Sequence, residues 1–127
     1  MRRERGQALA EYVLVLPLLL LLIFGIIDFA IVVLQYNTIA NAAREGARAG
    51  VVVQGDVTDV VDAAESAAAV LTVGLDSDDL TITAMADAET ISVTVDYTAR
   101  LITGIIIEAV GGDAEIPLSS TATMRRE

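Results

Sequence analysis

The chain has 127 residues, of which 54% are hydrophobic and 20% are charged, and its formal net charge is −10. This length fits one modest domain. Cys, His and Lys are missing from the sequence, which excludes disulfides, thiolate zinc sites, histidine bases, Schiff bases and phosphate-binding lysines. The acidity also argues against a nucleic-acid partner, because acidic surfaces repel phosphates. We therefore expect a protein that is not an enzyme and holds no metal or other cofactor.

The charges divide the chain into three parts. Three of the arginines lie within residues 1–5, an almost uncharged apolar segment follows, and residues 49–124 carry thirteen acidic residues against one arginine. We predict a basic leader over residues 1–6, a transmembrane and packing helix over 7–50, and a small acidic extracytoplasmic head domain over 51–127.

The apolar segment is long enough to suggest a membrane span. Tyr12–Ile27 contains sixteen uncharged residues, which as a helix would be roughly 24 Å long. A bilayer core is about 30 Å thick and needs about 20 residues, a length that is reached by including part of Phe29–Leu34. Because the arginines precede the segment, we expect a single pass through the cytoplasmic membrane, with the N-terminus in the cytoplasm and the head outside.

Three interpretations of this segment are open. The first is a secretory signal peptide, although no clear small-x-small cleavage site directly follows the apolar core. The second is an ordinary single-pass anchor. The third is the N-terminal helix of a pilin-like protein, which is first an anchor and later a packing element.

Residues 5–12 favour the third interpretation. They are Arg-Gly-Gln-Ala-Leu-Ala-Glu-Tyr, directly before the leucine-rich run. This motif resembles the processing site of type IV pilin-like proteins, in the form found in the Flp and Tad (tight adherence) branch. The resemblance implies that a prepilin peptidase cuts after Gly6 and leaves Gln7 as the new N-terminus. It also implies an assembly role for Glu11 and the adjacent Tyr12, with the Glu11 carboxylate pairing with the amino group of a neighbouring Gln7. The alternative is that Glu11 is simply a polar residue flanking a membrane helix.

A wider stretch resembles one family. VLPLLLLLIFGIIDF at 15–29, followed by AAREGARAG at 42–50, is similar to the TadE-like family of minor pilin-like proteins. The resemblance implies a pseudopilin of a Tad-type pilus, held in the membrane before processing and extracellular in the pilus afterwards. Its implied partners are the prepilin peptidase, other Tad/Flp pilins and the pilus assembly platform proteins. The alternative function is a permanently anchored protein whose acidic extracellular head binds a ligand or ion.

Three residues interrupt the apolar helix. Pro17 removes a backbone hydrogen bond, so we expect a kink, which membrane helices tolerate. Gly25 adds a second weak point. Asp28 either pairs with a polar or basic group of a partner subunit or is solvated at the outer headgroup level, and we favour the solvated state.

Small residues recur at every fourth position in the second half of the helix. Ala42, Gly46 and Gly50 make a smooth face where another element can approach closely. The two glycines cost about 1 kcal/mol each relative to alanine in a helix, so packing must compensate. The partner is either the protein's own head or another subunit.

The head is predicted to be α+β and pilin-like. Asp56 can cap a helix over about 57–71, and alternating residues predict strands over 80–86, 90–97 and 116–124, which form a small antiparallel sheet. Asp76–Asp79 is interpreted as a solvated acidic turn rather than a calcium loop. Residues 101–110, LITGIIIEAV, are either a buried crossover helix or an exposed patch for a partner, and we favour the buried helix.

Overall fold

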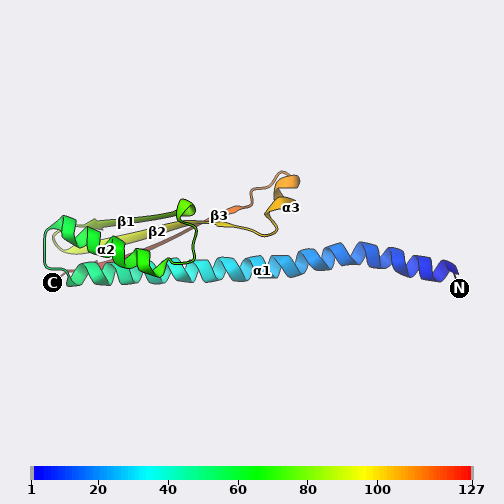
Figure 1. The fold of residues 1–127 in the computed structure, drawn as a ribbon, viewed down its shortest axis with the longest axis horizontal. Helices are drawn as coiled ribbons and strands as arrows, with labels where there is room; N and C mark the ends of the chain where they lie inside the picture. Colours follow the sequence, from blue (N-terminus) through cyan, green and yellow to red (C-terminus); the bar gives the residue numbers. More distant parts are fainter. Residues whose placement is uncertain (1, 127) are drawn as a thin grey trace.

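The computed structural model describes the backbone of residues 2–126 and the side chains of residues 6–126. The predicted basic leader comprises residues 1–6, and the side chains of its residues 1–5 lie outside this described part. The architecture is a long N-terminal helix, a short helix and a three-stranded antiparallel sheet, which confirms the predicted α+β class (Figure 1). The elements are α1 (Arg2–Val52), α2 (Val57–Leu71), η1 (Ser77–Asp79), β1 (Leu80–Ala86), β2 (Thr90–Arg100), α3 (Gly104–Ala109) and β3 (Glu115–Arg125).

The sheet is a simple meander with β2 in the centre. β2 pairs antiparallel with β1, where Leu80 faces Tyr97, and antiparallel with β3, where Tyr97 faces Leu118. The first two strands form a hairpin. Its turn is held by Asp87, whose carboxylate accepts hydrogen bonds from the Thr90 backbone N–H at 2.7 Å and from the Glu89 backbone N–H at 3.0 Å. β3 is an edge strand, as Pro117 predicts, because a proline has no N–H to donate to a further strand.

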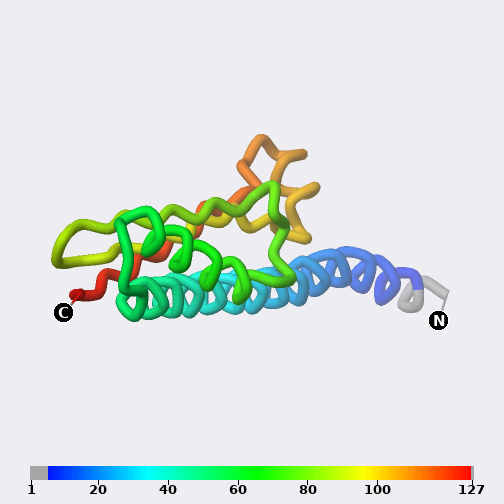
Figure 2. The backbone as a smooth tube through the Cα atoms, turned by 60° about the vertical axis from the view of Figure 1, so that its left-hand side comes forward, coloured from blue at the N-terminus to red at the C-terminus, as the bar shows by residue number. Residues whose placement is uncertain are grey.

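One face of β2 forms the centre of the core. The alternation predicted from the sequence is confirmed, since Ile91, Val93 and Val95 are fully buried and Tyr97 is nearly so. The second half of α1 and the whole of α2 cover this face (Figures 1 and 2). The opposite face is polar, and hydroxyl pairs such as Thr94 and Thr121, 2.9 Å apart, link its strands.

The two helices approach each other closely along the small-residue stripe. A Cβ on Gly46 would lie 2.8 Å from the Ala64 carbonyl oxygen, and one on Gly50 would collide with the Ile91 side chain. Ala42 is completely buried in the same core. The stripe therefore packs against the protein's own head, which decides between the two partners that the sequence left open.

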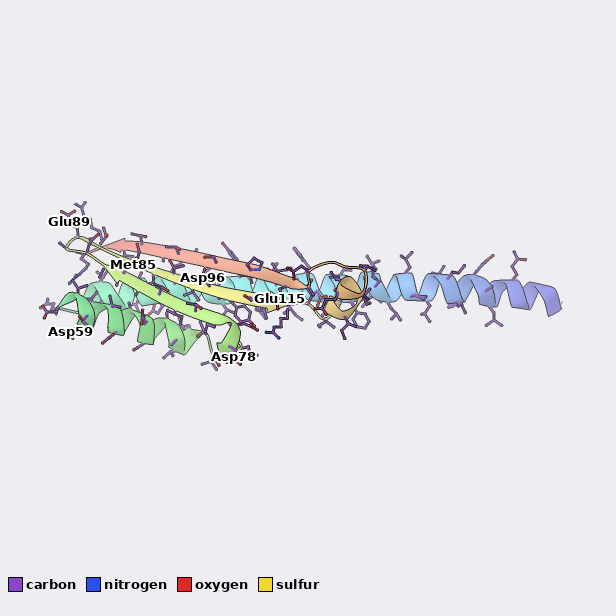
Figure 3. All side chains as sticks on the ribbon, turned by 90° about the horizontal axis from the view of Figure 1, so that it is seen from above. Asp59, Asp78, Met85, Glu89, Asp96 and Glu115 are labelled. Carbon is purple, nitrogen blue, oxygen red and sulfur yellow. The ribbon has the colours of Figure 1, made fainter. Side chains whose placement is uncertain are left out.

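The helix α2 begins and ends as the sequence predicts. Asp56 precedes its first residue, and the Asp56 backbone N–H donates to the Asp59 carboxylate at 3.3 Å, as in a capping box. After the helix, Gly74 adopts a positive φ of 96°, a conformation that side-chain-bearing residues rarely adopt. Acidic residues line the periphery of the head, as Asp59, Asp78 and Glu89 show in Figure 3.

Candidate functional site

The first half of α1 stands apart from the head. Its apolar side chains are largely exposed, among them Leu18 at 70% and Phe29 at 71%, and no element of the described residues covers them (Figures 1 and 2). The described helix from Gly6 to Val52 contains an 18-residue window with a mean hydropathy of 2.8, which makes it long and apolar enough to cross a membrane. An uncovered apolar helix of this kind requires lipid or other helices around it.

Pro17 lies inside this half without ending the helix. α1 continues from Arg2 to Val52, and Figure 1 shows a curve, rather than a break, in its N-terminal half. Gly25 has open space around it, since a Cβ there would meet no atom within 4 Å. Both residues are exposed, and Gly25 lines a groove between α1 and the head.

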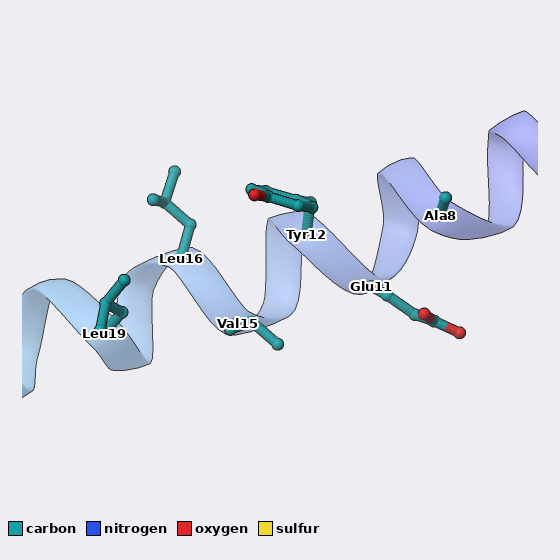
Figure 4. A pocket seen from close by; sticks show the side chains of 6 residues that line it. All are labelled: Ala8, Glu11, Tyr12, Val15, Leu16 and Leu19. Atoms are coloured by element: carbon teal, nitrogen blue, oxygen red, sulfur yellow. The ribbon is translucent and has the colours of Figure 1, made fainter.

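The residues of the predicted processing motif lie at the free end of α1. Gly6, Gln7, Glu11 and Tyr12 are all exposed. Figure 4 shows Tyr12 and Leu16 on one side of the helix, while Glu11 points away on the other. Within the described residues Glu11 forms no salt bridge. The Glu11 carboxylate is thus exposed, with no salt-bridge partner among residues 6–126.

Asp28 is not solvated, and the prediction that favoured a solvated carboxylate is wrong. Only 5% of the residue is exposed. Its carboxylate accepts three hydrogen bonds from the segment that follows β2: from the Ile102 backbone N–H at 2.7 Å, the Thr103 backbone N–H at 2.9 Å and the Thr103 hydroxyl at 2.6 Å. A buried carboxylate with three donors is well satisfied. Asp28 thus joins the end of the apolar half of α1 to the protein's own head.

The segment held by Asp28 is the Leu101–Val110 connector, which includes α3 and joins β2 to β3. Of the two alternatives we favoured a buried crossover helix over an exposed patch; a short helix, α3, is present, but it is neither buried nor a crossover, and the exposed patch is the alternative that fits. β2 and β3 are neighbouring antiparallel strands, so no crossover is needed, and the large side chains of the connector face outward. The exposed ones are Ile102, Ile105, Ile106 and Val110. Gly104, the first residue of α3, allows the chain to pass close to Ala114, since a Cβ on Gly104 would lie 2.9 Å from the Ala114 Cβ.

The acidic turn before β1 is built by its own hydrogen bonds. The Asp76 carboxylate accepts from the Asp78 backbone N–H at 3.1 Å and so caps η1. Asp79 forms a salt bridge with Arg100 at 2.9 Å. These carboxylates have partners within the chain, and their arrangement is accounted for by the turn itself.

Two contacts of the structure were not predicted from the sequence. The first is the Asp28 contact with the connector. The second joins α2 to the sheet edge, where the Glu65 carboxylate accepts from the Ala84 backbone N–H at 3.1 Å. A signal existed for the second contact, because Glu65 lies beside the buried Ala64 on α2, next to the face that turns toward the sheet.

These features define a class of protein: one N-terminal helix that is long and apolar enough to span a membrane, and a small α+β head packed on its second half. Within that class, residues 6–48 match the model of the family described as TadE-like protein. The match confirms the resemblance to the TadE-like family, and it covers residues 6–12 of the predicted processing motif, the apolar half of α1, and Ala42 and Gly46 of the small-residue stripe. No curated protein and no solved structure gives a significant match to the chain.

Proposed function

We propose that this protein is a minor pilin-like subunit, a pseudopilin, of a Tad-type pilus assembly system. The observation that carries the proposal is the division of α1 into two halves. The second half supplies the core of the head, whereas the first half is apolar and uncovered. A subunit with such a helix can insert the apolar half of α1 into a bilayer, and it can later pack this apolar surface against other subunits.

The leader motif supports a processing step between these two states. Removing residues 1–6 takes away three arginines and one glutamate, which shifts the formal net charge of the chain from −10 to −12. The arginines hold the N-terminus on the cytoplasmic side, so their loss makes it easier for α1 to leave the bilayer. The new amino group at Gln7 would meet the Glu11 carboxylate of a neighbouring subunit, because an unpaired carboxylate is costly on an apolar surface.

The intact mass of the protein isolated from membranes tests this proposal. In cells with an active prepilin peptidase, we expect a mature protein that begins at Gln7. Substituting Gly6→Val should block the cut and leave the full-length mass, while Gly25→Val, in the open part of α1, should not. A protein that keeps Arg2 and Arg3 in such cells would contradict the proposal and favour a permanently anchored protein whose acidic head binds a ligand or ion.

The role of Glu11 is tested separately from cleavage. We expect Glu11→Ala to insert in the membrane and to be processed normally, but to assemble poorly with other pilins. Leu9→Ala, which truncates another exposed side chain on the same part of α1 and keeps the carboxylate, provides the matched comparison. Normal co-isolation of Glu11→Ala with pilus fractions would show that the carboxylate is only a flanking polar residue.

A further inference from the structure

The Leu101–Val110 connector has an unusually apolar surface for a loop of a small acidic head. Ile105 and Val110 are each 82% exposed, and Ile102 and Ile106 are about half exposed. Glu108 is the only charged residue of the connector. A concentrated exposed apolar patch of this kind marks a site of interaction with a partner or a membrane.

The position of the connector indicates which of these it meets. Figure 1 shows that α3 lies beyond the end of the sheet, at the end of the head nearer the N-terminus of α1, and that it projects away from α1, as Figure 2 also shows. The hydrogen bonds from Ile102 and Thr103 to Asp28 fix it there. A groove of about 240 Å³ runs between the two, lined by Gly25, Phe29, Leu101 and others. The start of the connector, at Leu101 and Thr103, therefore lies against α1, and its exposed apolar side chains lie farther out from the helix.

The length of the span places this junction at the edge of a bilayer. A hydrocarbon core about 30 Å thick takes about 20 helical residues, so a span that begins at Tyr12 ends near residue 31. Asp28 then lies within about 5 Å of the outer boundary of the core. The connector, which extends from Asp28 toward the apolar half of α1, lies at the depth where acyl chains meet headgroups.

We infer that the Leu101–Val110 connector is a membrane-seating element that inserts Ile102, Ile105, Ile106 and Val110 into the outer leaflet beside α1. The occupant of this surface is lipid rather than a second copy, because the connector is tied to the membrane helix of its own subunit at the height of the bilayer surface. Glu108 remains free to face the headgroups. Asp28 is the positioning residue, since it holds the connector at this height. The inference rests on the proposed function in one respect, which is that α1 spans a bilayer.

The absence of cysteine from the sequence allows a direct test by single-site labelling. The full-length protein is labelled with an environment-sensitive dye at Ile105→Cys and reconstituted in phosphatidylcholine–phosphatidylglycerol vesicles containing lipids spin-labelled near the headgroup end of the acyl chain. Since interfacial side chains penetrate about 5–10 Å, these lipids should roughly halve the emission at position 105. Met85→Cys, an exposed apolar site on the outer face of the sheet, is the matched control and should be quenched little. Leu18→Cys reports whether α1 is inserted.

Each outcome separates the inference from the proposed membrane span. Quenching at positions 18 and 105 but not at 85 supports the inference. Quenching at 18 alone overturns it and leaves the span intact, whereas no quenching at 18 contradicts the span itself. If the dye at 105 is shielded only at high protein-to-lipid ratio and is insensitive to the quencher, the surface meets a second copy and the inference fails. In an Asp28→Ala background, quenching at 105 should fall toward that at 85.

Discussion

Removing the Asp28 carboxylate should release the Leu101–Val110 connector without unfolding the sheet. Asp28→Ala eliminates three hydrogen bonds to Ile102 and Thr103, with lengths of 2.6 to 2.9 Å. A hydrogen bond to a charged group contributes about 1.5–3 kcal/mol, but the three share one carboxylate and water replaces part of the loss. We expect the docking free energy of the connector to fall by about 2–3 kcal/mol in total.

Amide hydrogen exchange in lipid bicelles measures this loss directly. A fall of 2–3 kcal/mol corresponds to a roughly 30-fold to 150-fold loss of protection at the Ile102 and Thr103 amides, at 1.36 kcal/mol per tenfold change. Thr103→Val, which removes the hydroxyl but leaves both backbone N–H groups, should cost only about 1 kcal/mol. Asp62→Ala, at an exposed carboxylate of α2, should change nothing at these amides. Unchanged protection at Ile102 and Thr103 in Asp28→Ala would refute the proposed contact.

Two further predictions concern the head. Gly46→Ala gains about 1 kcal/mol of helix propensity but forces a Cβ to 2.8 Å from the Ala64 carbonyl oxygen, an overpacking that costs about 1–3 kcal/mol. We expect a net loss of about 1 kcal/mol and a lower Tm, while Gly25→Ala, which meets no atom within 4 Å, leaves the Tm unchanged or slightly higher; equal Tm values would contradict the close approach. Hydrogen bonds from the Thr90 backbone N–H, then from the Glu89 backbone N–H and the Thr90 hydroxyl, lower the pKa of Asp87 from its ordinary value. A lowered pKa in the folded state stabilises the hairpin above the unfolded-state pKa, and this stabilisation is lost as the pH falls through the folded-state pKa. A carboxyl NMR titration should therefore give a midpoint for Asp87 below that of an ordinary aspartate, and an ordinary or raised midpoint would contradict the turn.

Local patterns in the sequence predicted most of the head. The apolar spacing after Asp56 predicted where α2 begins and ends, because capping and apolar spacing act over a few residues. The alternation in β2 identified its buried face, since Ile91, Val93 and Val95 project to one side of a strand. Such features depend on neighbouring residues, so they can be predicted without knowing the fold.

The contact of Asp28 depends on a distant segment and could not be predicted in the same way. It joins residues 74 and 75 positions apart along the chain, and the donors are mostly backbone amides, which carry no sequence signature. Missing information about distant contacts also explains why the connector was wrongly expected to be buried. An apolar run such as Ile105–Ile107 has one composition whether it is buried in protein or turned toward lipid, and hydropathy alone does not distinguish these environments.

The partner of the small-residue stripe was likewise undecided until the structure was known. Small residues at four-residue spacing permit a close approach but do not say which element approaches. Here Gly46 meets α2 of the same chain, as the short distance to Ala64 shows. The processing motif and the role of Glu11 remain predictions, to be decided by the mass and assembly experiments.

The central position of α1 in the core sets an order of events in biogenesis. Ile39, Ala42, Ala43 and Ala47 are completely buried between α2 and the sheet, although they belong to the same continuous helix as the apolar half. A fragment that begins at residue 51 would lack the α1 side chains of its core and should aggregate. A fragment that begins just after Asp28 keeps these side chains and is the better candidate for a soluble head. If α1 spans a membrane as proposed, the strands have no complete apolar surface to fold on until the second half of α1 lies on the same side of the membrane as the head. Under the proposed topology, translocation and folding of the head would be coupled steps, and a stalled export intermediate would display a sheet whose apolar face is uncovered.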